Sequence, residues 1–162
     1  MQNNSFRPYT VCFTGHRYIP ESERAAIAAR LRQTLVELIE QGYKYFGAGG
    51  ALGFDTLAAK TVLDLRNEYP HIKLILVLPC KDQCAKWSAK DVRTYENIRA
   101  AADKTAWISE NYTPTCMHER NRHLVNFSSV CVCYLTKNSG GTAYTVKYAR
   151  ECGVKVMSIS NF

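Results

Sequence analysis

The stretch YKYFGAGGALGFDTLAAKTVLDL, Tyr43 to Leu65, joins an apolar run, a glycine-rich segment and a helical pattern. The run Tyr43 to Phe46 is short and rich in aromatic residues, which is typical of a buried strand. After the glycines, apolar side chains recur at the spacing of one helix face, at Leu57, Ala58, Val62 and Leu65. The stretch therefore predicts a strand, a glycine loop and a helix, which together form one βα unit.

The same unit is repeated along the chain. Apolar patterns predict strands at 10–14, 43–46, 73–78, 104–108, 130–135 and 154–159. They predict helices between Pro20 and Gly42 and at 57–65, 85–102, 117–126 and 143–152. Regular alternation with short turns is typical of a parallel sheet covered on both faces by right-handed crossovers. The sequence therefore predicts an α/β fold, a Rossmann-like three-layer sandwich with a mainly parallel central sheet.

Length and composition indicate a globular protein. The 162 residues suffice for one domain with a sizeable core, so we expect a single domain over 1–162 with its core at about 10–160. The seven cysteines form an odd set, and those in predicted core strands are expected to be reduced thiols. The longest apolar run, 72–79, is too short for a membrane span, and the N-terminus lacks an apolar signal region. We therefore expect a cytoplasmic protein without a membrane partner.

Three glycine-containing loops follow predicted strands: TGHR, GAGGALGFD and NSGGT. In open α/β sheets, ligands bind beyond the carboxyl ends of the strands, where helix N-termini attract anions. Glycines let the backbone approach a phosphate closely. We therefore expect the loops at Gly15, Gly49 and Gly141 to line one cleft that holds a phosphate. The alternative is that they are flexible turns, with Asp55 and Thr142 as helix caps.

Two segments supply charged candidates. After Gly15, the cation Arg17 could pair with a phosphate and His16 could donate a hydrogen bond or transfer a proton, although a surface turn would tolerate both. In MHERNRH, a helical wheel places Arg120 and Asn121 toward the sheet and Glu119 away from it. An inward arginine needs an anionic partner, because an unpaired buried charge is costly. The alternative for Arg120 is an ion pair on the helix surface.

Cysteine and histidine spacing gives a weak metal signal. Cys80 and Cys84, with His118 and His123, imitate a zinc ligand set. A predicted helix and strand intervene between the two pairs, so we expect neither a metal site nor a cofactor.

The motifs FTGHR, GGALGFD, RN in a helix and GGT, in this order, resemble the SLOG superfamily. This Rossmann-like group includes the Lonely Guy (LOG) phosphoribohydrolases and the DprA/Smf proteins. The order is most similar to its small bacterial YpsA-like branch and extends from Val11 to about Ile159. The resemblance implies a site for a nucleotide or a nucleotide-derived ligand, such as a nucleoside monophosphate or a molecule of the ADP-ribose type. It implies that the ligand's phosphate and ribose lie among Gly49, Gly50, Gly53, Gly141 and Thr142, and the adjacent Gly140 is a further candidate contact.

The sequence departs from the LOG signature at one position that matters for catalysis. Met117, His118 and Arg120 match the MHxRK segment, with Asn121 in place of the lysine. In the loop PGGxGTxxE, the position of the glutamate is occupied by Thr145. The missing carboxylate removes the obvious group for glycosidic cleavage. Asp55 could substitute for it or hold ribose hydroxyls, so Asp55 and Arg120 are the catalytic candidates and enzymatic activity stays open.

Two functions follow from these observations. The first is binding of a nucleotide-derived small molecule, as a sensor or as a hydrolase of its glycosidic or phosphate bond. The second is binding of single-stranded nucleic acid in the manner of DprA, without enzymatic activity. The net charge of +7 suits both, but the cations are spread along the chain and do not alternate with aromatic residues, which favours the first. A homodimer is also left open.

Overall fold

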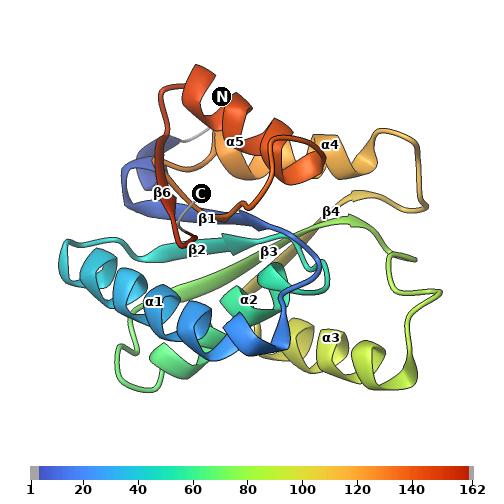
Figure 1. The fold of residues 1–162 in the computed structure, drawn as a ribbon, viewed down its shortest axis with the longest axis horizontal. Helices are drawn as coiled ribbons and strands as arrows, with labels where there is room; N and C mark the ends of the chain where they lie inside the picture. The colour runs from blue at the N-terminus through green and yellow to red at the C-terminus, as the bar shows by residue number, and fades with distance from the viewer. Residues whose placement is uncertain (1–3, 161–162) are drawn as a thin grey trace.

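The computed structural model describes residues 4–160 and shows one six-stranded sheet in the order β4-β3-β2-β1-β5-β6 (Figure 1). Every neighbouring pair of strands is parallel, which confirms the predicted parallel sheet. The strands are β1 Thr10–Gly15, β2 Tyr45–Ala48, β3 Lys73–Cys80, β4 Lys104–Ser109, β5 Val130–Tyr134 and β6 Lys155–Ser158.

Helices cover both faces of the sheet, so the three-layer Rossmann-like architecture is confirmed (Figure 1). The helices α1, α2 and α3 lie on one face, and α4 and α5 lie on the other. Their bounds are α1 Glu21–Glu40, α2 Phe54–Leu65, α3 Ala89–Ala101, α4 Cys116–Asn126 and α5 Gly141–Glu151, and a short 3-10 helix, η1, spans Asn4–Tyr9. None of the helices within residues 4–160 is long and apolar enough to cross a bilayer.

The helix predicted at 85–102 begins later, at Ala89. The side chain of Ser88 accepts a hydrogen bond from the Asp91 amide, 3.1 Å, and this N-cap sets the start of α3. The preceding residues, 81–87, form turns and a bend instead. The predicted start of the second strand at Tyr43 is also early, since β2 begins at Tyr45.

The strand order reverses at β1, which lies between β2 and β5. Chain order runs outward from β1 through β2 and β3 to β4, and α4 then returns the chain to β5 on the other side of β1. Ligands in open α/β sheets bind at such a reversal, beyond the carboxyl ends of the strands. The registers Thr14 with Cys133 and Gly15 with Tyr134 bring the ends of β1 and β5 to the same level.

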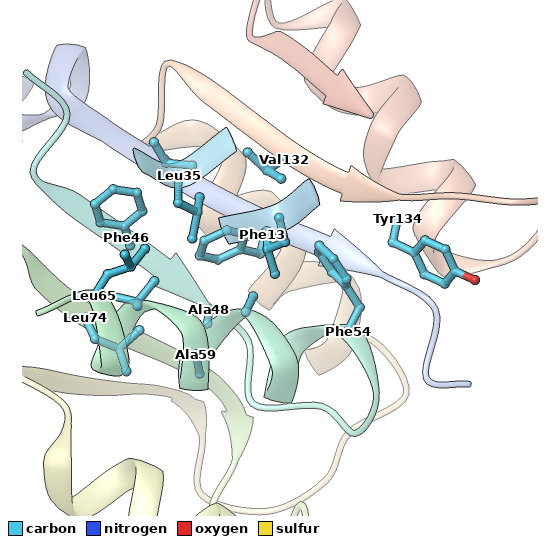
Figure 2. Packing of buried hydrophobic residues seen from close by; sticks show 14 of the residues in the cluster. Phe13, Leu35, Phe46, Ala48, Phe54, Ala59, Leu65, Leu74, Val132 and Tyr134 are labelled. Carbon is cyan, nitrogen blue, oxygen red and sulfur yellow. The ribbon is translucent and has the colours of Figure 1, made fainter. Parts of the chain in front are cut away.

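Several buried aromatic side chains pack near the carboxyl ends of the strands, on the face of the sheet that α1 and α2 cover (Figure 2). Phe54, the first residue of α2, is fully buried and packs against Phe13, with ring centroids 6.4 Å apart, and Tyr134, 5.9 Å apart. A side chain at Gly15 would overlap the Phe54 ring. Gly15 therefore lets the start of α2 pack against the end of β1, close to the reversal point.

The opposite face of the sheet has a second core that includes two of the thiols in the predicted core strands. Cys12 and Cys131 pack there with Val125 of α4 and Ala149 of α5. All seven cysteines lie within residues 4–160 and are unpaired, as expected for reduced thiols.

Candidate functional site

A cavity of about 290 Å³ lies at the reversal point, where the loops after β1, β2 and β5 meet α4. The first loop contributes Gly15, His16 and Arg17, and the loop before α2 contributes Ala51. The three strand-end loops therefore share one cavity, as expected from the sequence. The remaining lining residues are Thr14, Asp55, Met117, Arg120, Asn121, Lys137, Ser139, Gly140, Gly141 and Thr142.

The N-terminus of α5 opens into this cavity. The cap residue is Gly140, with φ 93°, and no side chain caps the helix, so Thr142 does not have the alternative role of a cap. The backbone amides of Gly141, Thr142 and Ala143 donate no hydrogen bond to other described residues. A side chain on Gly141 would meet no atom within 4 Å. These free amides can therefore receive an anion, which the helix dipole also attracts.

The cavity carries more positive than negative side chains. Arg17, Arg120 and Lys137 line it, and Asp55 is the carboxylate among its described lining residues. Arg17 and Lys137 are exposed and form no hydrogen bond or ion pair within residues 4–160. Two of the three cations are therefore available to a ligand, and the excess of positive charge favours an anionic one.

His16 joins two of the loops. Its Nε2 accepts a hydrogen bond from the backbone amide of Thr136, 2.8 Å, and its ring packs edge-on against Tyr134. Burial, assisted by the charge of Lys137, lowers the pKa of His16 below its ordinary value. The imidazole is therefore neutral near pH 7, and the accepting Nε2 assigns its proton to Nδ1. His16 can donate a hydrogen bond but does not serve as a cation at that pH.

Asp55 is buried in the first turn of α2, with 6% of its surface exposed. It does not cap that helix, whose cap residue is Gly53; its Oδ2 instead accepts a hydrogen bond from the Ala51 amide, 3.2 Å. Burial raises the pKa of the Asp55 carboxyl, although the charges of Arg120 and Arg17 oppose this effect. The site thus holds an acid that retains its proton to a higher pH than an exposed aspartate.

Arg120 points inward, as predicted, and 5% of its surface is exposed. Its Nη1 donates to the carbonyl oxygen of Gly49, and its Nε donates to Oδ1 of Asn121, 2.7 Å. No carboxylate of residues 4–160 lies within 4.0 Å of its guanidinium. Burial lowers the pKa of Arg120, and the charge of Asp55 opposes this effect only in part. Arg120 therefore holds the loop before α2 through a backbone carbonyl.

The glycines of that loop have packing roles in the structure. A Cβ on Gly49 would lie 2.5 Å from Nη1 of Arg120, and one on Gly50 would overlap Leu78. A Cβ on Gly53 would overlap the carbonyl oxygen of Arg17. Gly50 and Gly53 also have positive φ, 75° and 77°. Ala51 of this loop lines the cavity, whereas these three glycines are not among its described lining residues.

The structure adds cavity residues that the sequence analysis did not select. Lys137 and Ser139 precede the glycines of the loop before α5, and Met117 lies one turn before Arg120 on α4. Of these residues, Lys137 could have been selected from the sequence, because a cation three residues before a Gly-Gly-Thr turn indicates an anion site.

Neither the Cys and His spacing nor the position of the LOG glutamate corresponds to a metal or catalytic site among the described residues. No group of three or more potential metal ligands is found in residues 4–160, and His118 and His123 instead pack against Tyr144 and Phe127. Thr145, at the position of the LOG glutamate, is buried and donates its hydroxyl to the carbonyl oxygen of Gly141, 2.8 Å. That hydroxyl is therefore satisfied within its own helix.

The fold and this cavity define a Rossmann-like α/β protein with a cavity of excess positive charge at the strand reversal. The chain belongs to the YpsA family, described as the "YspA SLOG family", whose model matches residues 11–158. It is 30% identical over 135 residues to the SPbeta prophage-derived protein YoqJ of Bacillus subtilis, covering 75% of this chain and 79% of YoqJ. It is 32% identical over 133 residues to a UPF0398 protein of Brevibacillus brevis, covering 78% and 69%.

Solved structures share the fold at low sequence identity. DprA of Streptococcus pneumoniae superposes with a TM-score of 0.67 at 18% identity, and DprA of Helicobacter pylori with 0.66 at 16%. Each match covers 94% of this chain, but only 50% of the first DprA chain and 65% of the second. These likenesses confirm the expected SLOG-type fold, and this chain corresponds to a part of the DprA proteins.

Proposed function

We propose that this protein binds a nucleotide or a nucleotide-derived small molecule in the cavity at the strand reversal. The observation that carries the proposal is the uncapped N-terminus of α5, which opens into a cavity with two exposed, unpaired cations. A phosphate at the amides of Gly141 and Thr142 would also meet Arg17 and Lys137, which line the same space.

The remaining polar groups suit the sugar of such a ligand. Asp55 lines the cavity and has one carboxylate oxygen, Oδ2, engaged with the Ala51 amide. Its other oxygen can accept from ribose hydroxyls. His16 adds a donor at Nδ1, because its Nε2 is occupied. Arg120 supports this arrangement from behind, through the carbonyl oxygen of Gly49.

Binding is tested by calorimetric titration of the full chain with AMP. Arg17→Ala and Lys137→Ala should each weaken binding roughly tenfold, since a charge-assisted hydrogen bond contributes about 1.5 kcal/mol at an exposed position. The matched control is Lys155→Ala, which removes the same charge from an exposed position on β6. Affinity for AMP that is unchanged in both site variants would contradict the proposed phosphate site.

A hydrolytic activity is a second candidate at the same site. Asp55 is the carboxyl in position to act as an acid or base, and its raised pKa suits the donation of a proton to a leaving group. The test is to incubate the protein with AMP and analyse the products. Adenine with ribose 5-phosphate would show glycosidic cleavage, adenosine with phosphate would show phosphatase activity, and unchanged AMP would favour a sensor. Either activity should be lost in Asp55→Asn.

Binding of single-stranded nucleic acid is the alternative function. The Helicobacter pylori DprA structure is described as showing a single-stranded DNA binding mode, and this chain shares its fold. The net charge of this chain, +7, suits a nucleic acid as well. A steep fall of affinity with salt, for an oligonucleotide bound more tightly than AMP, would favour this alternative.

A further inference from the structure

A second and larger cavity, of about 600 Å³, adjoins the first on the side of α1, α2 and α3. It is bounded by the β1–α1 loop, the first half of α2 and the first half of α3. Arg17 lines both cavities, and its side chain is exposed. A ligand longer than one nucleotide that contacts Arg17 can therefore reach residues of both cavities.

The second cavity also has an excess of available positive charge. Lys60 of α2 and Lys90 of α3 line it, are exposed, and form no hydrogen bond or ion pair within the part of the chain that the structure describes. Of the two carboxylates that line it, Glu21 is already paired with Arg24, 3.6 Å. The unpaired lysines are the partners that a second phosphate would need.

Aromatic side chains complete the lining. Trp87 is partly exposed and is held edge-on against Tyr95, with ring centroids 5.5 Å apart at 89°. Tyr18 follows Arg17 directly and 75% of its surface is exposed. Every nucleobase has a face that can stack on such rings. The second cavity thus combines the two features that recognise a nucleotide, cations and aromatic faces.

Size leads to the same conclusion. Small-molecule sites span about 300–1,000 Å³. The first cavity, at about 290 Å³, lies at the lower end of this range, and the second is about twice as large. A mononucleotide would leave the larger cavity and its unpaired lysines unused.

We infer that the ligand is a dinucleotide, with one nucleotide in each cavity and its phosphate linkage beside Arg17. This inference rests on the proposed function, because the first nucleotide occupies the site described above. The terminal phosphate of the first nucleotide lies at the start of α5. The linking phosphate lies between Arg17 and the lysines Lys60 and Lys90, which line the same cavity, and the second base stacks in the Trp87 region. The same pair of nucleotides could be a free dinucleotide or the end of a single strand, and we assign the free dinucleotide because the cations outside the two cavities form no continuous track in the sequence.

The experiment compares three probes by calorimetry at constant salt: AMP, the 5′-phosphorylated dinucleotide pApA, and a 5′-phosphorylated twelve-residue oligoadenylate. We expect pApA to bind at least about tenfold more tightly than AMP, because two further charge-assisted contacts become available. The double variant Lys60→Ala/Lys90→Ala should lose this advantage and keep its affinity for AMP. Both positions are exposed and unbonded, so the fold should be unaffected.

The matched control is Lys147→Ala/Lys155→Ala, which removes two exposed lysines from α5 and β6 on the other side of the molecule. Equal losses in the two double variants would show a general charge effect and overturn the inference. Equal affinity of the wild type for pApA and AMP would overturn it as well, while leaving the proposed function intact. Binding of the oligoadenylate that is tenfold tighter than that of pApA would assign the site to nucleic acid and overturn the free dinucleotide. If none of the probes binds, the proposed function fails.

Discussion

Replacing Gly49 by alanine should destabilise the protein although it adds a single methyl group. The new Cβ would lie 2.5 Å from Nη1 and 2.8 Å from Cζ of Arg120, far inside normal contact distance. Gly49 does not have a positive φ, so alanine suits the backbone there and the guanidinium is the obstacle. To accommodate the methyl group, Arg120 must give up its hydrogen bond to the Gly49 carbonyl oxygen.

The magnitude follows from that hydrogen bond. A hydrogen bond to a charged group contributes about 1.5–3 kcal/mol, and for a protein of this size 1 kcal/mol shifts Tm by about 2–4 °C. Gly49→Ala should therefore lower Tm by about 3–12 °C. Gly141→Ala is the matched control, because a side chain there meets no atom within 4 Å, and its Tm should stay within about 2 °C of the wild type.

A double-mutant cycle tests the cause. The three nearest atoms to a Cβ at Gly49 all belong to Arg120, so the methyl group has room once that side chain is removed. In the Arg120→Ala background, Gly49→Ala should cost less than about 0.5 kcal/mol, and the coupling should be about 1.5–3 kcal/mol. The assay is urea unfolding followed by circular dichroism. A full penalty for Gly49→Ala in that background would refute the reasoning, since the collision would then lie elsewhere.

Two further predictions concern the same loop. Gly53→Ala should lower the free energy of unfolding more than Gly42→Ala, because both glycines have positive φ but only a Cβ at Gly53 would overlap a backbone carbonyl, that of Arg17. Equal losses of free energy in urea unfolding would contradict a steric clash at Gly53. Since burial raises the pKa of Asp55 above 3.8, its contribution to stability is present below that pH and is lost as pH rises through the higher folded pKa. Asp55→Asn should therefore gain stability relative to the wild type as pH rises above the ordinary pKa of an aspartate, and a constant difference between unfolding curves at different pH would rule this out.

The fold could be predicted because its signals are local. Each strand and helix is marked by its own apolar period, and alternation of the two leaves few topologies. The late start of α3 shows the limit of periodicity alone, because the boundary is set by the cap at Ser88 and not by the apolar pattern. A serine three residues before Asp91 was a readable signal for that boundary.

The site was less predictable because it depends on contacts between distant residues. A glycine in the sequence shows that no side chain occupies the space beside its backbone, but it does not show which other atom lies there. At Gly49 that atom belongs to Arg120, 71 residues later, and at Gly53 it is the backbone of Arg17. Loop glycines that suggest a phosphate cradle can therefore serve to pack one loop against another. Lys137 stands three residues before the Gly-Gly-Thr turn, a signal that can be read from the sequence, but its place in the cavity beside the β1–α1 loop could not be read in the same way.

The burial of Arg120 bears on how the site recognises an anion. Its guanidinium already donates to a backbone carbonyl and to the side chain of Asn121, and the burial that lowers its pKa also limits its access to a ligand. Arg17 and Lys137 line the same cavity, are exposed, and have no partner within residues 4–160. A ligand phosphate gains more from these free donors, because binding to Arg120 would require breaking hydrogen bonds that hold the loop. We therefore propose that Arg120 is a positioning residue, whose charge also raises the local potential. We therefore expect direct contact with a ligand from the exposed cations Arg17 and Lys137 and from the amides at the start of α5.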